Sequence, residues 1–203
     1  YLADSSALTW LDLFDPEPGV LDQLAEELQL DRHSVEDALA PRERAKVSRH
    51  ATHTFFTCYA ADLTVDDNDL PDLTIGRISA FVMPNGLITV RSARGAPIDL
   101  DEVVERWEGQ GLLGHGVGAL VHGLLDVLVD AHFGAVQLMD DKLEDLEDLL
   151  FAESVQTREV QRRVFALRKA LVRLRRVVLP MRELVAGVMR ERMTGRWQPS
   201  RAL

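Results

Sequence analysis

Two long segments of opposite charge, each with apolar residues at alternating steps of three and four, constrain the fold of this chain most strongly. Residues 126–153 carry nine acids and one lysine, whereas residues 158–176 carry eight bases and one glutamate. Such spacing is typical of helices that pack along a stripe, and the opposite charges favour an antiparallel hairpin. The two stripes are Val121, Leu125, Leu128, His132, Val136, Met139, Leu143, Leu146 and Leu150, and then Val160, Val164, Leu167, Leu171, Leu174, Val178, Met181, Val185 and Val188.

The first 110 residues predict short strands alternating with short helices. Asp15 and Pro16 have the composition of a helix start, with Asp15 as N-cap and Pro16 at the first helical position. Pro84-Asn85-Gly86 predicts a tight turn between two strands. The expected strands are 9–14, 53–63, 74–83 and 87–91, and the expected helices are 15–28, 31–39 and 99–109.

These patterns predict two domains, an α/β unit at 1–110 and paired long helices at 111–203. The glycine-rich stretch 109–118 lies between them as a hinge or helix start. Pro180 falls inside the second apolar stripe, so we expect a kink or weakened hydrogen bonds in that helix.

The composition bounds the function. A net charge of −10 disfavours general binding to nucleic acid, whose phosphates attract excess positive charge. The one cysteine, Cys58, cannot form an intramolecular disulfide, which favours a reducing compartment. There is no signal peptide and no run of about 18 apolar residues, so we expect no membrane span here. Because it begins at Tyr1 and stops at Leu203, we expect the chain to be a piece of a longer protein.

Two acidic segments are candidate sites for hard divalent cations, which prefer carboxylate and carbonyl oxygens. The first comprises the acids of 140–148, and the alternative for them is a solvated helix face paired with arginines of the partner helix. The second is Asp66-Asp67-Asn68-Asp69, for which a plain solvated turn is the alternative. It is not an EF-hand, because it lacks the glycine at the turn and the closing glutamate.

Other chemistry has little support. The six histidines show no zinc-hydrolase spacing, and neither a Ser/His/Asp set with local support nor a phosphate-binding loop is visible. We therefore expect that the chain is not an enzyme. The arginines of 158–176 would suit nucleic acid or an anionic membrane, but apolar residues at core spacing interrupt them, so we expect intramolecular or intersubunit pairing.

Several segments, taken in order, resemble the cytosolic domain of the CorA-type magnesium and cobalt transporters. No single segment is specific, but their ordered combination is, and it covers nearly the whole chain. The segments are Trp10–Leu13 with Asp15-Pro16, Val35–Leu39 followed by Pro41–Val47, Leu87–Arg91, Leu124–Asp130 with Phe133, Leu167–Lys169, Leu174–Arg176 and Pro180–Glu183.

The resemblance implies an α+β fold, an α/β/α sandwich with a mixed sheet followed by a long antiparallel helical hairpin. It implies a homopentameric channel whose cytosolic funnel lies at the cytoplasmic face of the inner membrane and senses Mg²⁺. The family's stalk helix and transmembrane segments would follow Leu203. We expect the present fragment to be soluble, to conduct nothing by itself, and to touch the membrane only through those further segments.

The resemblance also implies regulatory Mg²⁺ between subunits, held by carboxylates. The matching positions here are Asp66, Asp67 and Asp130. Abundant Mg²⁺ would screen these acids and hold the funnel closed, whereas scarcity would let them repel one another and open the pore. Because the family's stalk acid lies beyond Leu203, we expect the fragment to bind divalent cations weakly and to be a monomer or a weak oligomer.

Two alternatives remain. The first is the cytosolic domain of a zinc-transporting member of the same superfamily, so the ion is Mg²⁺, Co²⁺ or Zn²⁺. The second is an interaction module that uses the acidic and basic helices as a coiled-coil adaptor without transport.

Overall fold

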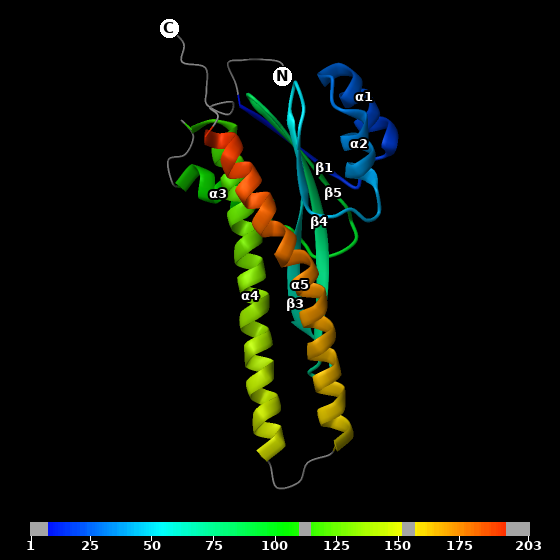
Figure 1. Ribbon diagram of the computed structural model, residues 1–203, viewed down its shortest axis with the longest axis vertical. Coiled ribbons are helices and arrows are strands. Elements are labelled where there is room, and N and C mark those ends of the chain that lie inside the picture. Colours follow the sequence, from blue (N-terminus) through cyan, green and yellow to red (C-terminus); the bar gives the residue numbers. More distant parts are fainter. Residues whose placement is uncertain (1–7, 110–114, 152–156, 194–203) are drawn as a thin grey trace.

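A mixed five-stranded sheet lies between two layers of helices, and a long helical hairpin extends beyond one end of it (Figure 1). This computed structural model describes residues 8–109, 115–151 and 157–193, with side chains as far as 190. It confirms the α+β sandwich with a mixed sheet and an antiparallel hairpin. The elements are β1 Thr9–Phe14, α1 Pro18–Leu28, α2 Arg32–Leu39, β2 Lys46–Arg49, β3 Thr54–Val65, β4 Pro71–Met83, β5 Gly86–Arg91, α3 Leu100–Gly109, α4 Val117–Phe151 and α5 Thr157–Met193.

The sheet has the order β1-β5-β4-β3-β2. Only β1 and β5 are parallel, with Trp10 opposite Leu87, and the other neighbours are antiparallel. The long β3–β4 hairpin dominates the sheet, pairing from Thr54 with Val82 to Val65 with Pro71. The edge strand β2 was not predicted, because its four residues alternate too briefly to show a strand period.

Helices α1 and α2 cover one face of the sheet. Leu21 and Val35 pack there against Phe55, Phe81 and Ile88, all of them buried. Neighbouring strand residues face opposite sides, so Phe55 points to this layer while Phe56 belongs to the core on the other face.

The predicted start of α1 at Asp15 was wrong. Asp15 has a φ of 46°, outside the helical region, and the helix begins at Pro18 with Glu17 as N-cap. The proline at the helix start is thus Pro18 rather than Pro16. The predicted start of α2 is confirmed, because the Asp31 carboxylate accepts a 2.9 Å hydrogen bond from the Ser34 backbone N–H.

Helices α3, α4 and α5 cover the opposite face (Figure 1). Phe56 and Ile78 of the sheet pack with Leu124 of α4 and Leu184 of α5, all fully or nearly fully buried. Farther along the hairpin, Leu73 of β4 forms a smaller cluster with residues that include Met139 and Leu174. The sheet and the long helices therefore share buried apolar clusters along much of their common length.

Part of each predicted apolar stripe faces outward, which corrects the expectation of a simple coiled coil. The helices pack on the sheet as well as on each other, so residues facing the sheet are buried on a 3.6-residue period, such as Ala170, Leu174, Val177, Met181, Leu184 and Val188. The stripe residues that are exposed instead are Val136, Leu143, Leu150, Val164, Leu171 and Val178.

Helix α4 is long and apolar enough to cross a membrane by length and composition alone, although its sequence has no unbroken run of about 18 apolar residues. More than half of its most apolar stretch is buried inside the protein. Packing on the sheet accounts for that composition, as for a core helix of a globular domain.

Helix α5 continues through Pro180 as a single helix. Its axis changes direction along its length, and its last part leans toward the start of α4 (Figure 1). This bend agrees with the effect expected of an internal proline.

Two glycines let the segment after β5 cross β4 at close range. A Cβ on Gly76 would lie 2.1 Å from the carbonyl oxygen of Ala96, and Gly95 has a φ of +114°. A side chain at position 76 would clash with the Ala96 backbone. Any residue other than glycine at position 95 would be strained at this φ.

We expect Gly76→Ala to lower the free energy of unfolding by about 1–3 kcal/mol, because the new methyl group must displace backbone rather than a flexible side chain. Gly134→Ala is the matched control: nothing lies within 4 Å of its Cβ position on α4. That control should raise stability by roughly 0.5–1 kcal/mol through helix propensity. Urea denaturation of both variants checks this, and equal effects of the two substitutions would contradict the close approach.

Candidate functional site

The loop between β3 and β4 contains the predicted ligands Asp66 and Asp67. The Asp66 carboxylate accepts backbone hydrogen bonds from Asn68 at 2.8 Å and Leu70 at 2.9 Å. These bonds stabilise the ionised form and hold the pKa of Asp66 below its usual value. Asp66 therefore stabilises its own turn, while Asp67 is exposed.

Asp69, in the same loop, joins the two long helices. Its carboxylate contacts Lys142 of α4 at 2.7 Å and Arg163 of α5 at 3.2 Å. The hydrogen bond from Lys142, followed by the positive charges of both partners, lowers the pKa of Asp69. The backbone of Asp69 has a φ of 58°, a conformation that aspartate tolerates better than most residues. The Asp69 carboxylate of this loop thus lies between Lys142 of α4 and Arg163 of α5.

Asp130 lies on α4, where α3 packs against it. Its carboxylate contacts the Arg106 guanidinium at 2.7 Å, and Arg106 also contacts Asp126 at 2.7 Å and Glu102 at 2.5 Å. These hydrogen bonds, led by the one to Asp130, raise the pKa of Arg106 above its ordinary value. The third predicted ligand is therefore already paired with a cation of the protein.

The three predicted ligands do not converge in one chain. Asp66 and Asp67 share the loop whose Asp69 contacts Lys142, and Asp130 precedes Lys142 by 12 positions on α4, about 18 Å of helix. Mg²⁺ binds oxygens at about 2.1 Å, so one ion cannot join both regions within one subunit. Among the described residues, no group of three or more histidines, cysteines and acids is arranged to hold a metal.

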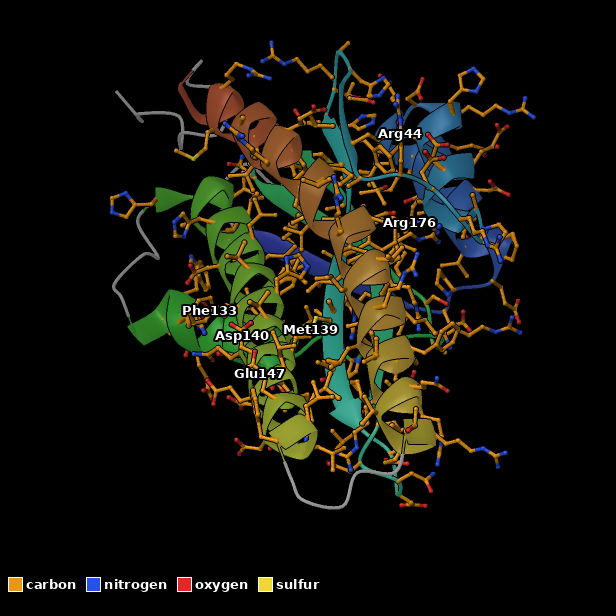
Figure 2. All side chains as sticks on the ribbon, turned by 60° about the horizontal axis from the view of Figure 1, so that its bottom comes forward. Arg44, Phe133, Met139, Asp140, Glu147 and Arg176 are labelled. Atoms are coloured by element: carbon orange, nitrogen blue, oxygen red, sulfur yellow. The ribbon has the colours of Figure 1, made fainter. Side chains whose placement is uncertain are left out.

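The expected pairing between the acidic and basic helices takes another form. Within residues 8–109, 115–151 and 157–190, no ion pair joins an α4 carboxylate to an α5 arginine. Asp140 and Glu147 on α4 and Arg176 on α5 are exposed on separate parts of the hairpin (Figure 2). The basic helix pairs instead with its own Glu159 and with acids of the β3–β4 hairpin.

We expect Asp69→Asn to lower the Tm in low salt, because it removes the anion from between Lys142 and Arg163. The exposed Asp67→Asn, two positions away, is the matched control and should change the Tm little. The difference should shrink in about 0.5 M NaCl, which screens half-exposed ion pairs. Thermal melts at two salt concentrations check this; a deficit independent of salt would argue against an ionic role.

Several residues that carry the family resemblance have structural contacts. Asp12 forms a 2.6 Å ion pair with Arg91 and accepts a hydrogen bond from the Thr89 hydroxyl, which in turn accepts one from the Trp10 indole N–H. This network ties β1 to β5 at the sheet edge. These side chains therefore have a structural role in joining the two strands, and no ligand is needed to account for them.

The structure also brings together a serine, a histidine and an aspartate that sequence reasoning did not connect. The Ser34 hydroxyl lies 3.0 Å from Nε2 of His50, whose Nδ1 lies 3.7 Å from Asp31. Ser34 is only 2% exposed, and its hydroxyl also bonds to Asp31. Because the Ser34 hydroxyl donates its hydrogen to Asp31, it is not positioned to give that hydrogen to His50, and the cluster joins α2 to the β2–β3 turn.

His53 is stacked on His50 with ring centroids 4.7 Å apart, and within the part of the chain that the structure describes its buried Nε2 has no hydrogen-bond partner. The Thr52 hydroxyl donates to the Gln29 carbonyl, so Nδ1–H of His53 must donate to Thr52. Its Nε2 then carries a buried lone pair, and protonation there would create an N–H without an acceptor. Burial, with a further contribution from His50, lowers the pKa of His53 to about 4.

This lowered pKa makes folding sensitive to acid. The unfolded chain protonates its histidines near pH 6.5 while folded His53 stays neutral until about pH 4, so stability is full above about pH 6.5 and falls as the pH drops between these values. The loss from His53 should reach ~3 kcal/mol. His132, whose pKa burial also lowers, adds to it.

We expect His53→Leu to flatten the fall in unfolding free energy between about pH 6.5 and 4, whatever it does to stability at neutral pH. His122→Leu, at an exposed position on α4, is the control and should keep the wild-type slope. Urea denaturation across this pH range measures both slopes. The assignment fails if His53→Leu and wild type lose the same free energy over that interval.

Comparisons with known proteins agree with this fold. The model of the family described as "CorA-like Mg2+ transporter protein" matches residues 5–201. The cobalt/magnesium transport proteins CorA of Methanocaldococcus jannaschii and Thermotoga maritima are each 23% identical, over 91% and 93% of this chain and 56% and 52% of their own lengths. The chain thus spans about half the length of these relatives.

Two solved structures share the architecture. The soluble domain of CorA from M. jannaschii aligns with a TM-score of 0.64 at 20% identity, covering 87% of this chain and 68% of that one. The cytoplasmic domain of ZntB from Vibrio parahaemolyticus aligns with a TM-score of 0.67 at 12% identity, covering 90% and 69%. At these identities the likeness concerns the fold alone.

Proposed function

Because this chain belongs to the CorA-like Mg²⁺ transporter family, we propose that it is the cytosolic regulatory part of a transporter for Mg²⁺ and Co²⁺. The observation that carries the proposal is the family match over residues 5–201. The sandwich and hairpin agree with it, since soluble domains of CorA and ZntB have this fold. The chain has no role as an enzyme in this proposal.

We propose that divalent cations act on the domain at Asp66, Asp67 and Asp130, each of which is at least partly exposed. Since Asp66 caps its own loop and Asp130 pairs with Arg106, a cation must compete with existing partners, which favours low affinity. The two regions are too far apart for one ion, so we propose sites completed by other subunits. When bound, the ion would supply positive charge between carboxylates that otherwise repel one another.

The proposed assembly is a homopentamer at the cytoplasmic face of the membrane. Large apolar side chains exposed on the hairpin support contacts beyond the single chain, because such side chains mark interaction sites where they gather on a surface. They are Val129, Phe133, Val136, Leu143 and Leu150 of α4, with Val164, Phe165, Leu171, Val178 and Leu179 of α5.

Zinc is the second candidate cargo. The favouring observation is the similarity to the ZntB cytoplasmic domain, which has a TM-score as high as that of the CorA soluble domain. The cargo is therefore best measured directly, with Mg²⁺, Co²⁺ and Zn²⁺ in one assay.

The test is a chimera in which residues 8–193 replace the matching segment of M. jannaschii CorA. In liposomes we expect divalent-ion flux that internal Mg²⁺ inhibits. The triple variant Asp66→Asn, Asp67→Asn, Asp130→Asn should need several-fold more Mg²⁺ for half-inhibition, because three carboxylates are lost.

The matched control removes charge from exposed acids outside the predicted set, Asp140→Asn with Glu147→Gln, and should keep the inhibition of the unmodified chimera. Inhibition by Mg²⁺ that is identical in the triple variant would contradict the three ligands. A folded, assembled chimera without any divalent flux would contradict the transport role.

A further inference from the structure

The side of α4 that faces away from α5 carries an acidic edge, formed by Asp141, Glu144 and Asp148. All three are exposed, and their spacing of three and four positions places them on one side of the helix. Met139, which packs with α5 in a buried cluster, projects from the opposite side. Among residues 8–109, 115–151 and 157–190, the three acids of this edge have no ion-pair partner.

The side of α5 that faces away from α4 carries a basic edge, formed by Arg158, Lys169 and Arg176. Steps of 11 and seven positions are close to whole numbers of helical turns, so these three exposed bases share one side. Leu174, which packs against α4, projects from nearly the opposite side, and Figure 2 shows Arg176 on the side of α5 away from α4. In the part of the chain that the structure describes, the three bases form no ion pair either.

The stability of the separate helices does not explain these charges. Asp148 lies in the last turn of α4, which ends at Phe151 and contains no base, and Arg158 is the second residue of α5. A helix carries partial negative charge at its C-terminal end and partial positive charge at its N-terminal end, so each of these side chains opposes the dipole of its own helix. A partner of opposite charge would offset that cost.

The two edges lie at matching heights along the hairpin. Asp69 contacts both Lys142 and Arg163, so these two positions are level with each other. Because the helices are antiparallel, the acidic edge is level with about residues 157–164, where the basic edge begins. Two copies side by side in the same orientation would therefore set the acidic edge of one against the basic edge of the next. Phe165, which is 70% exposed beside the basic edge, would add apolar contact.

We propose that the acidic edge of α4 docks on the basic edge of α5 in a second copy of this chain. Charge complementarity between two surfaces of one sequence favours another copy, whereas a net charge of −10 is repelled by an anionic membrane. The edges differ and lie on opposite sides, so each copy contacts two neighbours head to tail, and a ring forms where the rotation closes. The inference rests on the proposed function only in that the proposed assembly brings copies together.

The experiment is sedimentation equilibrium of the 203-residue chain in about 0.05 M NaCl, with two variants that reverse one edge each. Wild type should associate at high protein concentration, and about 0.5 M NaCl should weaken its association several-fold. Each variant alone should associate about tenfold more weakly than wild type, because like charges then face each other. The variants are Arg158→Glu, Lys169→Glu, Arg176→Glu on the basic edge and Asp141→Lys, Glu144→Lys, Asp148→Lys on the acidic edge.

The decisive measurement is an equimolar mixture of the two variants. Each edge of one variant meets an edge of opposite charge on the other, so the mixture should associate about tenfold more tightly than either variant alone. The matched control makes the same change in net charge on another exposed side of α5 and should associate as wild type does. It is Arg168→Glu, Arg175→Glu, Arg182→Glu.

The proposal is overturned if wild type stays monomeric at about 1 mM protein in low salt, if the mixture associates no better than its components, or if the control loses as much as the basic-edge variant. Monomeric wild type that binds phosphatidylglycerol vesicles through the basic edge would overturn it in favour of a membrane surface. A chimera without transport leaves the association of these variants measurable, and association that ignores the two edges leaves transport by the chimera unaffected, so the two proposals fail separately.

Discussion

The packing of α4 and α5 on the β3–β4 hairpin is the interaction on which the rest of the structure depends. The two central strands carry apolar residues on both faces, so each face requires a cover. Leu21 and Val35 of the short helices cover one face, and Leu124 and Leu184 of the long helices cover the other. The loop acids and the α3–α4 contact acquire their positions from this arrangement.

Ion pairs join the elements of the fold at places where apolar contacts are fewer. Asp69 connects the sheet to α4 and α5 through Lys142 and Arg163, and Arg106 connects α3 to α4 through Asp126 and Asp130. Arg106 neutralises Asp130, which the family resemblance would assign to Mg²⁺. Lys142 neutralises Asp69, which lies in the same loop as the other two assigned acids. These acids therefore take part in ion pairs that join neighbouring elements of the fold.

Much of the fold follows from patterns in the sequence. The long strands, the turn at Pro84-Asn85-Gly86, the short helix beginning near Asp31 and both long helices were predicted, because each depends on local periodicity or on turn and helix-boundary residues. The outward face of the hairpin was not predicted. A stripe of period 3.5 does not show whether a helix packs on another helix or on a sheet, and the sheet decides which side is buried.

The candidate site was less accessible to prediction. Asp66, Asp67 and Asp130 were chosen by resemblance, which carries no information about the partners of each carboxylate. Arg106 is separated from Asp130 by 24 positions, and only the packing of α3 on α4 brings them together. The spacing of Asp126 and Asp130 was a visible signal, because residues four apart share a helix face.

The contacts around Asp69 have a consequence for motion. The hairpin packs near α3 in the main apolar core, whereas Lys142 and Arg163, closer to its other end, contact Asp69 through ion pairs at the surface. Local opening needs less free energy where few apolar contacts must break. Because salt screens exposed ion pairs but leaves apolar burial largely unaffected, the contacts at Asp69 should weaken with ionic strength while the apolar core changes little.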